Sequence, residues 1–357
     1  MKIFDEMEKR GHEELIFNYF GDVDLKLIIS LHDTTLGRAI GGLRMNQYDS
    51  EMDAIIESLR LSQGMTYQCV TADTDGGGGN ALLYGNPKTD KNEAYFRALG
   101  RFIESLKRKL NIYPDLGTDV LDFKYIQRET GNTIFDKEID DSSKSTARIT
   151  AYGVYWGIKA CAKEVFTRDN LSGLSFAVQG LGNVGKILVD LLLKEKATLY
   201  ISDLVYDNIK VIEDRHPDAD VHVVKPDELL YQETDFIVPC AVGSIIDAAN
   251  VDRLNCKVIA GAAYNIFADE SLIEKAHENN ILYAPAFVIS AGDLFLLNKN
   301  LKLGDVESSQ DRTKIIYDIL LDILRRARSR SISPYQVAKE DAIERYKKID
   351  QIKNILC

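Results

Sequence analysis

Two patterns of hydrophobic and polar positions follow one another along the chain. In the first part, short apolar segments at 25–32 and 81–85 alternate with segments at 50–65 and 91–110 whose apolar residues recur every three or four positions. Short apolar runs predict buried strands, and a spacing of three and four predicts amphipathic helices. This part of the chain, which we place at residues 1–135, is therefore predicted to be an α/β domain with a mixed sheet.

A polar segment separates this domain from a second one. Residues 135–150 (FDKEIDDSSKSTARIT) have no apolar period, and we interpret them as a linker. A helical segment and a new alternation of strands and helices follow, which predicts a doubly wound parallel sheet at residues 150–332. Its expected strands are 174–179, 197–203, 235–240, 257–263 and 281–287.

Two helical segments close the chain, at 311–330 and 333–356, with Ser333 as the predicted N-cap and Pro334 in the first turn of the last helix. Two basic runs, KRKL at 107–110 and RRARSR at 325–330, fall in predicted helices. We interpret both runs as solvated helix faces.

The composition is that of an ordinary globular protein, with 45% hydrophobic and 28% charged residues in a chain of 357. A formal net charge of -11 argues against nonspecific binding to nucleic acid or to an anionic membrane. We expect no signal peptide and no membrane span, and hence a cytoplasmic protein. The cysteines form no CxxC pair and the histidines have no metal-ligand spacing, so neither a disulfide framework nor a metal site is expected.

The most specific local motif is GLGNVG at 180–185. It follows an apolar strand, begins a predicted helix, and precedes a second strand that ends in Asp203. This context is the one that a dinucleotide-binding loop requires. Gly180 would permit the tight turn, Gly182 would let a pyrophosphate approach the helix N-terminus, and Gly185 would let helix and strand pack closely. The Asp203 carboxylate would bind an adenosine ribose and repel a 2′-phosphate, which favours NAD over NADP. The alternative interpretation of GLGNVG is a glycine turn that binds no cofactor.

Several further motifs lie along the chain in a recognisable order. They are TTLGRAIGGLRMNQYDSEMDAIIESLRLSQGMTYQCV, GGGGN, PDLGTDV, TAYGVYWG, VQGLGNVG, PCAVGSIID and VIAGAAYN. Together they resemble the leucine, phenylalanine and valine dehydrogenases, in the amino-acid dehydrogenase superfamily that includes glutamate dehydrogenase. The resemblance implies a substrate and oligomerisation domain, a Rossmann-type NAD domain, a cleft between them, a last helix (333–357) that returns to the first domain, and a homo-oligomer.

The resemblance also implies a set of catalytic positions, of which two are changed. Where the family has two lysines, one activating water and one holding the substrate carboxylate, this chain has Asn80 and Gln68. Asp115, which matches the family's catalytic aspartate, is retained. An amide orients a carbonyl or an imine but takes no proton at neutral pH, so ordinary leucine dehydrogenase activity is not expected.

Other positions follow from the same resemblance. The expected substrate contacts are Gly41, Gly42, Met45 and Ser290, of which Ser290 replaces a family asparagine. The expected cofactor contacts are Gly180, Gly182, Asn183, Val184, Gly185, Asp203, Thr150, Cys240, Ala241 and Asn265.

Four consecutive glycines at 76–79 precede Asn80, and the aspartates Asp73 and Asp75 precede them. Bare backbone at four positions predicts a loop against which something lies closely. The two aspartates would make an acidic cleft with Asp115, with Asp75 helping it in proton transfer. Alternatively, they cap a turn or face solvent.

Three readings of the function follow. The first is an NAD-dependent oxidoreductase acting on the CH–NH2 or C=N group of an amino acid, amine or imine, in which Asp115 transfers a proton and Asn80 and Gln68 orient the substrate. The second is a non-redox enzyme that keeps NAD as an internal hydride shuttle. The third is a catalytically silent NAD-binding homologue that acts through oligomerisation.

Overall fold

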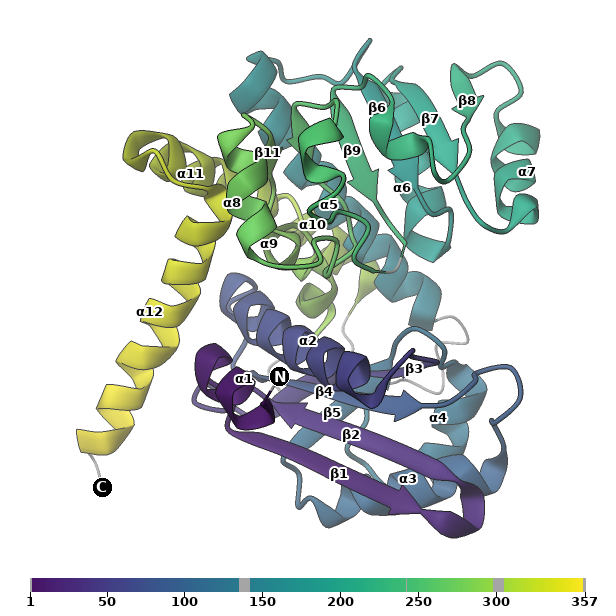
Figure 1. Ribbon diagram of the computed structural model, residues 1–357, viewed down its shortest axis with the longest axis vertical. Helices are drawn as coiled ribbons and strands as arrows, with labels where there is room; N and C mark the ends of the chain where they lie inside the picture. The colour runs from purple at the N-terminus through teal and green to yellow at the C-terminus, as the bar shows by residue number, and fades with distance from the viewer. Residues whose placement is uncertain (1, 135–141, 242, 298–304, 356–357) are drawn as a thin grey trace. The chain divides into compact units, whose positions relative to one another are not determined.

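The structure is a computed structural model that describes residues 2–134, 142–241, 243–297 and 305–355. The chain forms two compact units, and each is described by itself (Figure 1). The first unit holds the chain up to Ser145 and again from Ala342 onward, and the second holds Thr146–Leu296 and Asp305–Asp341. The division therefore falls inside the last helix, whereas the sequence had placed it at residue 333.

The first unit is built on a mixed sheet of five strands in the order β1-β2-β4-β3-β5. β1 and β2 pair antiparallel, β2 and β4 pair antiparallel, and β3 lies parallel to both β4 and β5. The elements of this unit are α1 (Ile3–Arg10), β1 (Glu14–Phe20), η1 (Gly21–Val23), β2 (Leu25–Leu31), β3 (Ala39–Asn46), α2 (Glu51–Thr71), β4 (Gly77–Tyr84), α3 (Glu93–Ser105), β5 (Leu110–Pro114) and α4 (Val120–Ile126).

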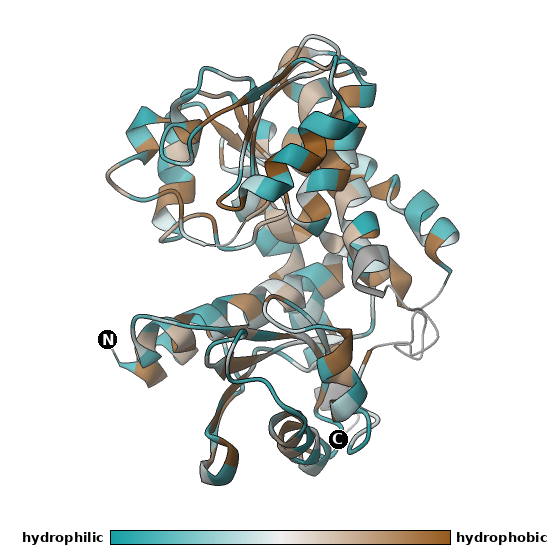
Figure 2. Ribbon diagram, turned by 90° about the vertical axis from the view of Figure 1, so that its right-hand side faces the viewer, coloured by the Kyte–Doolittle hydropathy of each residue, from teal (hydrophilic) through white to brown (hydrophobic). Residues whose placement is uncertain are grey.

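Helices cover both faces of this sheet (Figure 1). On one face, Ala54, Ile55 and Leu59 of α2 pack on Ile28 and Leu82. On the other face, apolar residues of α3 and α4 pack on the alternate residues of the same strands. Figure 2 shows the resulting division of the helices into a hydrophobic and a hydrophilic side. The mixed α/β sheet expected from the sequence is confirmed.

The glycine run is a strand and not a loop. Gly77, Gly78 and Gly79 belong to β4, between β2 and β3. A Cβ on Gly78 would lie 2.1 Å from the Thr66 hydroxyl and 2.2 Å from the Ser62 carbonyl oxygen of α2. The close approach that the glycines predicted therefore exists, but its partner is the chain's own helix α2, which packs directly on the strand backbone.

The predicted helix 91–110 is also wrong at its end. α3 ends at Ser105, and Lys107 and Arg108 have φ values of 52° and 69°, outside the helical region. The run KRKL is thus a turn leading into β5, and only the other basic run, 325–330, lies in a helix. Tertiary pairing of β5 with β3 decided this boundary, because β5 needs an extended chain from Leu110.

The second unit is a parallel sheet of six strands in the order β8-β7-β6-β9-β10-β11. Numbered along the chain this order is 3-2-1-4-5-6, the doubly wound order of dinucleotide-binding folds, and it confirms the α/β prediction. The elements are α5 (Ser142–Phe166), β6 (Ser175–Gln179), α6 (Asn183–Lys194), β7 (Thr198–Ser202), α7 (Tyr206–Arg215), β8 (Val221–Val223), η2 (Leu229–Tyr231), β9 (Phe236–Pro239), η3 (Val251–Arg253), β10 (Val258–Ile259), α8 (Ser271–Glu278), β11 (Leu282–Tyr283), α9 (Ala286–Ile289), η4 (Ala291–Leu296), α10 (Val306–Arg312), α11 (Ile315–Arg330) and α12 (Pro334–Ile355).

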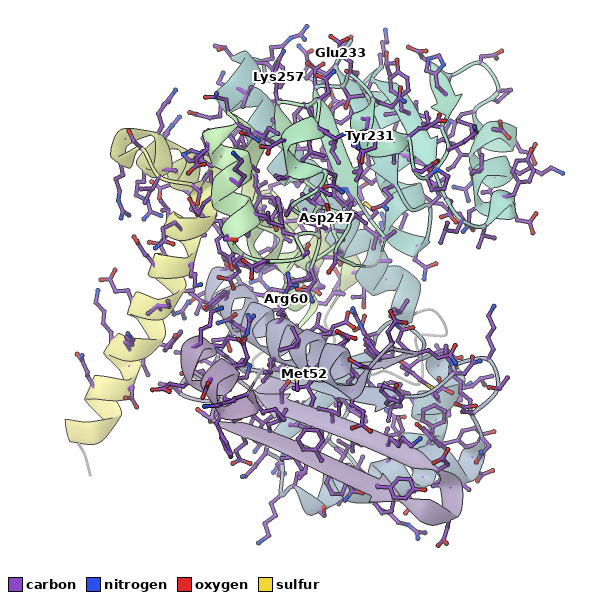
Figure 3. The ribbon with its side chains drawn as sticks, viewed as in Figure 1. Met52, Arg60, Tyr231, Glu233, Asp247 and Lys257 are labelled. Atoms are coloured by element: carbon purple, nitrogen blue, oxygen red, sulfur yellow. The ribbon has the colours of Figure 1, made fainter. Side chains whose placement is uncertain are left out.

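Polar side chains form hydrogen bonds at the amino-terminal edge of this sheet. Asp235, just before β9, accepts hydrogen bonds from the Ser175 backbone N–H at 3.1 Å and from Lys257 Nζ at 3.4 Å. Lys257, which Figure 3 labels, also lies 4.9 Å from the centre of the Phe166 ring. In the same unit, the Arg253 guanidinium lies 4.1 Å from the centre of the Tyr231 ring, which Figure 3 also labels. The Asp235 contacts thus join the amino ends of β6, β9 and β10.

The last helix begins as the sequence predicted, because the Ser333 hydroxyl accepts the Gln336 N–H at 3.1 Å and Pro334 is the first helical residue. Part of the predicted linker, from Ser142, is already helical in α5, and residues 135–141 lie outside the described residues. Among the described residues no helix is both long enough and apolar enough to cross a membrane.

Candidate functional site

The carboxyl end of β6 carries the dinucleotide motif. Gly180 has φ 88°, where only glycine is unstrained, and a Cβ there would lie 2.7 Å from the Ala241 Cβ after β9. A Cβ on Gly185 would lie 2.0 Å from the Gly180 carbonyl oxygen, so the third glycine lets α6 pack on the loop. Gly182, in contrast, has open space at its Cβ position.

This open space adjoins the amino end of α6. Its N-cap is Gly182, and no side chain caps the helix. The first backbone N–H groups of a helix need acceptors, and a phosphate beside them benefits from the helix dipole. The loop after β6 also lies where the strand order reverses, between β6 and its sheet neighbour β9. The residues present therefore fit a dinucleotide pyrophosphate.

Asp203 lies where the fingerprint expects an acid, immediately after β7. Its carboxylate accepts hydrogen bonds from the backbone N–H groups of Leu181 at 2.6 Å and Val205 at 2.7 Å. Asn208 Nδ2 donates a third hydrogen bond at 3.2 Å. These bonds hold the acid against the glycine loop, so its position relative to Gly180 and Gly182 is fixed before any ligand binds.

The other expected cofactor residues lie around the same unit. Cys240 follows β9 and is partly buried, and desolvation raises the pKa of its thiol to about 11, which keeps it uncharged. Thr150 lies on α5, with its hydroxyl donated to the Thr146 carbonyl at 3.0 Å. The Asn265 carbonyl accepts the Ser244 N–H at 2.6 Å, and Ser290 is buried at the end of α9.

The first unit brings Asn80 and Asp115 to the two sides of Gly42. Asn80 Nδ2 donates to the Gly42 carbonyl at 3.2 Å. A Cβ on Gly42 would lie 2.8 Å from the Asp115 Cβ, so only glycine leaves room for the acid there. Of the neighbouring positions, Gly41 lies against the Gly79 backbone, and Met45 is fully buried in the sheet core.

Asn80 ends a buried chain of hydroxyl groups. The Ser58 hydroxyl donates to Asn80 Oδ1 at 3.1 Å, and the Ser30 hydroxyl donates to the Ser58 carbonyl at 2.7 Å. Ser30 and Ser58 are both fully buried, and Asn80 is 2% exposed. Because the Gly42 carbonyl can only accept, the atom facing it must be the Asn80 nitrogen, and Oδ1 must face Ser58. The orientation of the amide is thus fixed by chemistry.

Asp115 is held by Arg44. The guanidinium donates Nε to Asp115 at 2.9 Å and Nη1 to Glu57 of α2 at 2.6 Å. The Arg44 side chain is 14% exposed. Burial by itself would lower the pKa of Arg44, but the two carboxylates outweigh it and raise the pKa above its ordinary value. Arg44 therefore stays positively charged, and its guanidinium is already bound to two carboxylates.

The remaining catalytic candidates lie differently. Gln68 is fully buried in α2. Asp73 has φ 53° and binds Arg345 of α12 at 2.6 Å, while Arg345 also donates to the Val70 carbonyl at 2.9 Å. Asp75 is exposed. Among the described residues, neither aspartate forms a hydrogen bond or an ion pair with Asp115. Asp73 lies in a turn, which is the alternative that the sequence left open.

Sequence reasoning missed the residues that support the site. Ser30, Glu57 and Ser58 match no motif, and each lies next to its partner only after the strands pair. One signal was available: Ser58, Ser62 and Thr66 recur every four residues on a helix whose buried face should be apolar. Within the part of the chain that the structure describes, no group of His, Cys, Asp and Glu could hold a metal ion.

Comparison with known proteins agrees with this architecture. The dimerisation domain of the Glu/Leu/Phe/Val dehydrogenases matches residues 22–132, and the Glutamate/Leucine/Phenylalanine/Valine dehydrogenase family matches residues 204–302. Leucine dehydrogenase of Thermoactinomyces intermedius is 40% identical over 97% of this chain and 93% of that protein. Phenylalanine dehydrogenase of Bacillus thermotolerans is 36% identical over 94% of this chain and 88% of that protein.

A solved structure is similar in fold over the whole chain. L-tryptophan dehydrogenase from Nostoc punctiforme has a TM-score of 0.75 and 32% identity, and the match covers 98% of this chain and 100% of that one. With these full-length relatives and the two domain matches, the chain belongs to the Glu/Leu/Phe/Val dehydrogenase family.

Proposed function

We propose that this protein is an NAD-dependent oxidoreductase that acts on the CH–NH2 or C=N group of an amino acid or a related amine or imine, with an altered catalytic site. Its relatives are amino-acid dehydrogenases. The observation that carries the altered chemistry is the Asn80 amide, which is locked between Gly42 and Ser58 beside Asp115.

NAD would be held by the second unit. The free N–H groups at the start of α6, from Gly182, Asn183 and Val184, would bind its pyrophosphate, and Asp203 its adenosine ribose. Thr150, Cys240, Ala241 and Asn265 would contact the rest of the cofactor. When bound, the nicotinamide supplies a hydride acceptor for the carbon that carries the nitrogen.

The proton and the substrate would be handled by the first unit. Asp115 is the proposed proton-transfer group, and Arg44 fixes the orientation of its carboxylate. One Asn80 N–H is bound to the Gly42 carbonyl, and the second is left to donate to an oxygen or nitrogen of the substrate. Gln68 would be a second neutral orienting group, and Gly41, Gly42, Met45 and Ser290 would shape the substrate site.

The charges in this unit favour a particular kind of substrate. Around Arg44, two carboxylates face one cation, which leaves a net charge of -1. Arg44 is bound to Asp115 and Glu57, and it is therefore not available to a substrate carboxylate. The two positions where the family's lysines are expected carry the neutral amides Gln68 and Asn80. An amine or imine without an α-carboxylate is therefore favoured over an ordinary amino acid. We further propose a cytoplasmic homo-oligomer.

The test is NADH formation by the purified protein over α-amino acids and the corresponding decarboxylated amines, with NAD binding measured separately by calorimetry. Turnover of an amine or an amino acid that Asp115→Asn abolishes supports the proposal. Tight NAD binding without turnover of any compound would instead favour an internal hydride shuttle or a silent homologue, and no NAD binding would contradict all three.

A further inference from the structure

The first unit has an open pocket of about 360 Å³ at the edge of the sheet where β3 and β5 begin. The Ala39 N–H donates to the Lys109 carbonyl at 3.1 Å, which brings Arg38 alongside the turn before β5. The charged residues that line this pocket are Arg38, Lys107, Arg108, Lys109, Glu13 and Glu14. We call it the basic pocket.

The two carboxylates that line the basic pocket are both bound by neighbouring groups. Glu14 forms an ion pair with Lys109. The Glu13 carboxylate accepts the Thr34 N–H and the Thr34 hydroxyl, both at 2.7 Å. Arg38, Lys107 and Arg108 are exposed and form no ion pair with any residue in the described ranges. The lining of this concave place thus carries four cations and two carboxylates, a net charge of +2, on a chain whose net charge is -11.

Two of these cations, Lys107 and Arg108, lie in an unusual backbone conformation. Lys109 N–H donates to the Leu106 carbonyl at 3.1 Å, which closes a four-residue turn. Its central residues, Lys107 and Arg108, have φ values of 52° and 69°, the signs of a type I′ turn. Such turns favour Asn-Gly, because a positive φ is disfavoured for residues with long side chains. The chain therefore accepts strain at two consecutive positions that carry positive charge into the pocket.

We propose that the basic pocket is a binding site for a small multivalent phosphate, separate from the dinucleotide loop of the second unit. Arginine presents several N–H donors in a planar fork that suits phosphoryl oxygens, and lysine adds a point charge. The pocket volume is within the range of small-ligand sites. Arg38 approaches from the start of β3, and Lys107 and Arg108 approach from the turn, so two separate segments would hold one anion.

The test uses inorganic pyrophosphate as the probe and isothermal titration calorimetry at low ionic strength. The central variant is Lys107→Asn with Arg108→Gly, which removes two cations and installs the sequence that the turn prefers. This variant is expected to fold at least as well as the wild type, so a loss of binding cannot be attributed to misfolding. Its expected dissociation constant is about tenfold higher or more, because the affinity rests on charge-assisted hydrogen bonds.

Two further variants complete the design. Arg38→Gln, on the other segment, is expected to weaken binding without touching the turn. Lys88→Gln with Lys124→Gln removes two exposed cations elsewhere in the same unit and is expected to bind as the wild type does. Any pyrophosphate bound at the dinucleotide loop is common to all variants and cancels in the comparison.

The outcomes are distinct. No difference between the turn variant and the wild type overturns the proposal, as does an equal loss in the Lys88 and Lys124 control. Light scattering on the same samples covers the remaining case. A change of mass in the turn variant without a change in pyrophosphate affinity would show that these cations face a second copy of the chain, and would also overturn it.

Discussion

Arg44 binds the carboxylate of Asp115 through two hydrogen bonds, from Nε to Oδ2 at 2.9 Å and from Nη2 to Oδ1 at 3.4 Å. The same guanidinium binds Glu57 through Nη1. The two carboxylates thus share one cation, although only Asp115 lies beside Gly42 and Asn80. This arrangement allows the catalytic contribution of Asp115 to be separated from its structural contribution.

Asp115→Asn is expected to lower the rate of NADH formation by about 100- to 10,000-fold, because the amide cannot transfer a proton. It should also lower the free energy of unfolding by about 1–3 kcal/mol, since Arg44 loses a charged partner. Glu57→Gln removes the other partner and is the matched control, with a similar loss of stability and a much smaller loss of rate. Equal losses of rate in the two variants, measured by NADH absorbance and urea unfolding, would contradict a catalytic role for Asp115.

Ser58→Ala tests the orientation of Asn80. Without the Ser58 hydroxyl, the buried Asn80 Oδ1 loses its donor, which should cost about 1–3 kcal/mol of stability. The amide then turns more freely, and kcat should fall by about tenfold while KM changes little. Ser62→Ala, one turn further along α2 and equally buried, removes a hydroxyl that bonds His12 and the carbonyls of its own helix instead of Asn80. A fall of kcat in both variants would indicate that α2 packing, and not the Asn80 orientation, matters.

Gln68→Lys combined with Asn80→Lys tests whether the substitutions at these two positions account for the altered chemistry. We expect the double variant to gain NAD-dependent deamination of a branched or aromatic amino acid, because a lysine in each position supplies a cation and a base. It should also be less stable, since both positions are buried and charge is costly there. Gln68→Met with Asn80→Met provides side chains of similar length without charge and should gain no activity. A folded, NAD-binding lysine variant that remains inactive would mean that the pocket has diverged at further positions.

The stability of the protein should fall in mildly acidic solution because of His12. Burial, with a smaller contribution from His32, lowers the pKa of His12 from 6.5 to about 3. The unfolded chain therefore takes up a proton near pH 6.5, while the folded chain does not until about pH 3. The contribution of His12 is complete above pH 6.5 and is lost as the pH falls toward 3.

Urea unfolding of the wild type and of His12→Gln at pH 7 and pH 5 checks this expectation. Between these two values the wild type should lose about 2 kcal/mol more than the variant, because glutamine does not titrate. Carboxylates contribute to both proteins and cancel in the difference. Parallel losses in the two proteins would show that His12 is protonated as easily in the folded state as in the unfolded state.

The sequence by itself determined the class of fold and the nucleotide motif. The apolar periods depend on local spacing, so they gave both α/β sheets, and the strand-glycine-helix context of GLGNVG gave the loop after β6. The changed residues Gln68 and Asn80 were also visible at once, because the surrounding motifs fix their register. The Ser333 cap was predicted for the same reason, since a cap acts within one turn of its helix.

Only the tertiary structure decided what surrounds those residues. The glycines 77–79 became a strand because α2 packs on bare backbone, and the run KRKL became a turn because β5 pairs with β3. Ser30 and Ser58 meet only when β2 and α2 come together over β4, and Glu57 meets Arg44 only when α2 packs beside β3. Contacts of this kind join residues far apart in the sequence, and no local pattern encodes them, because they exist only after the chain has closed on itself.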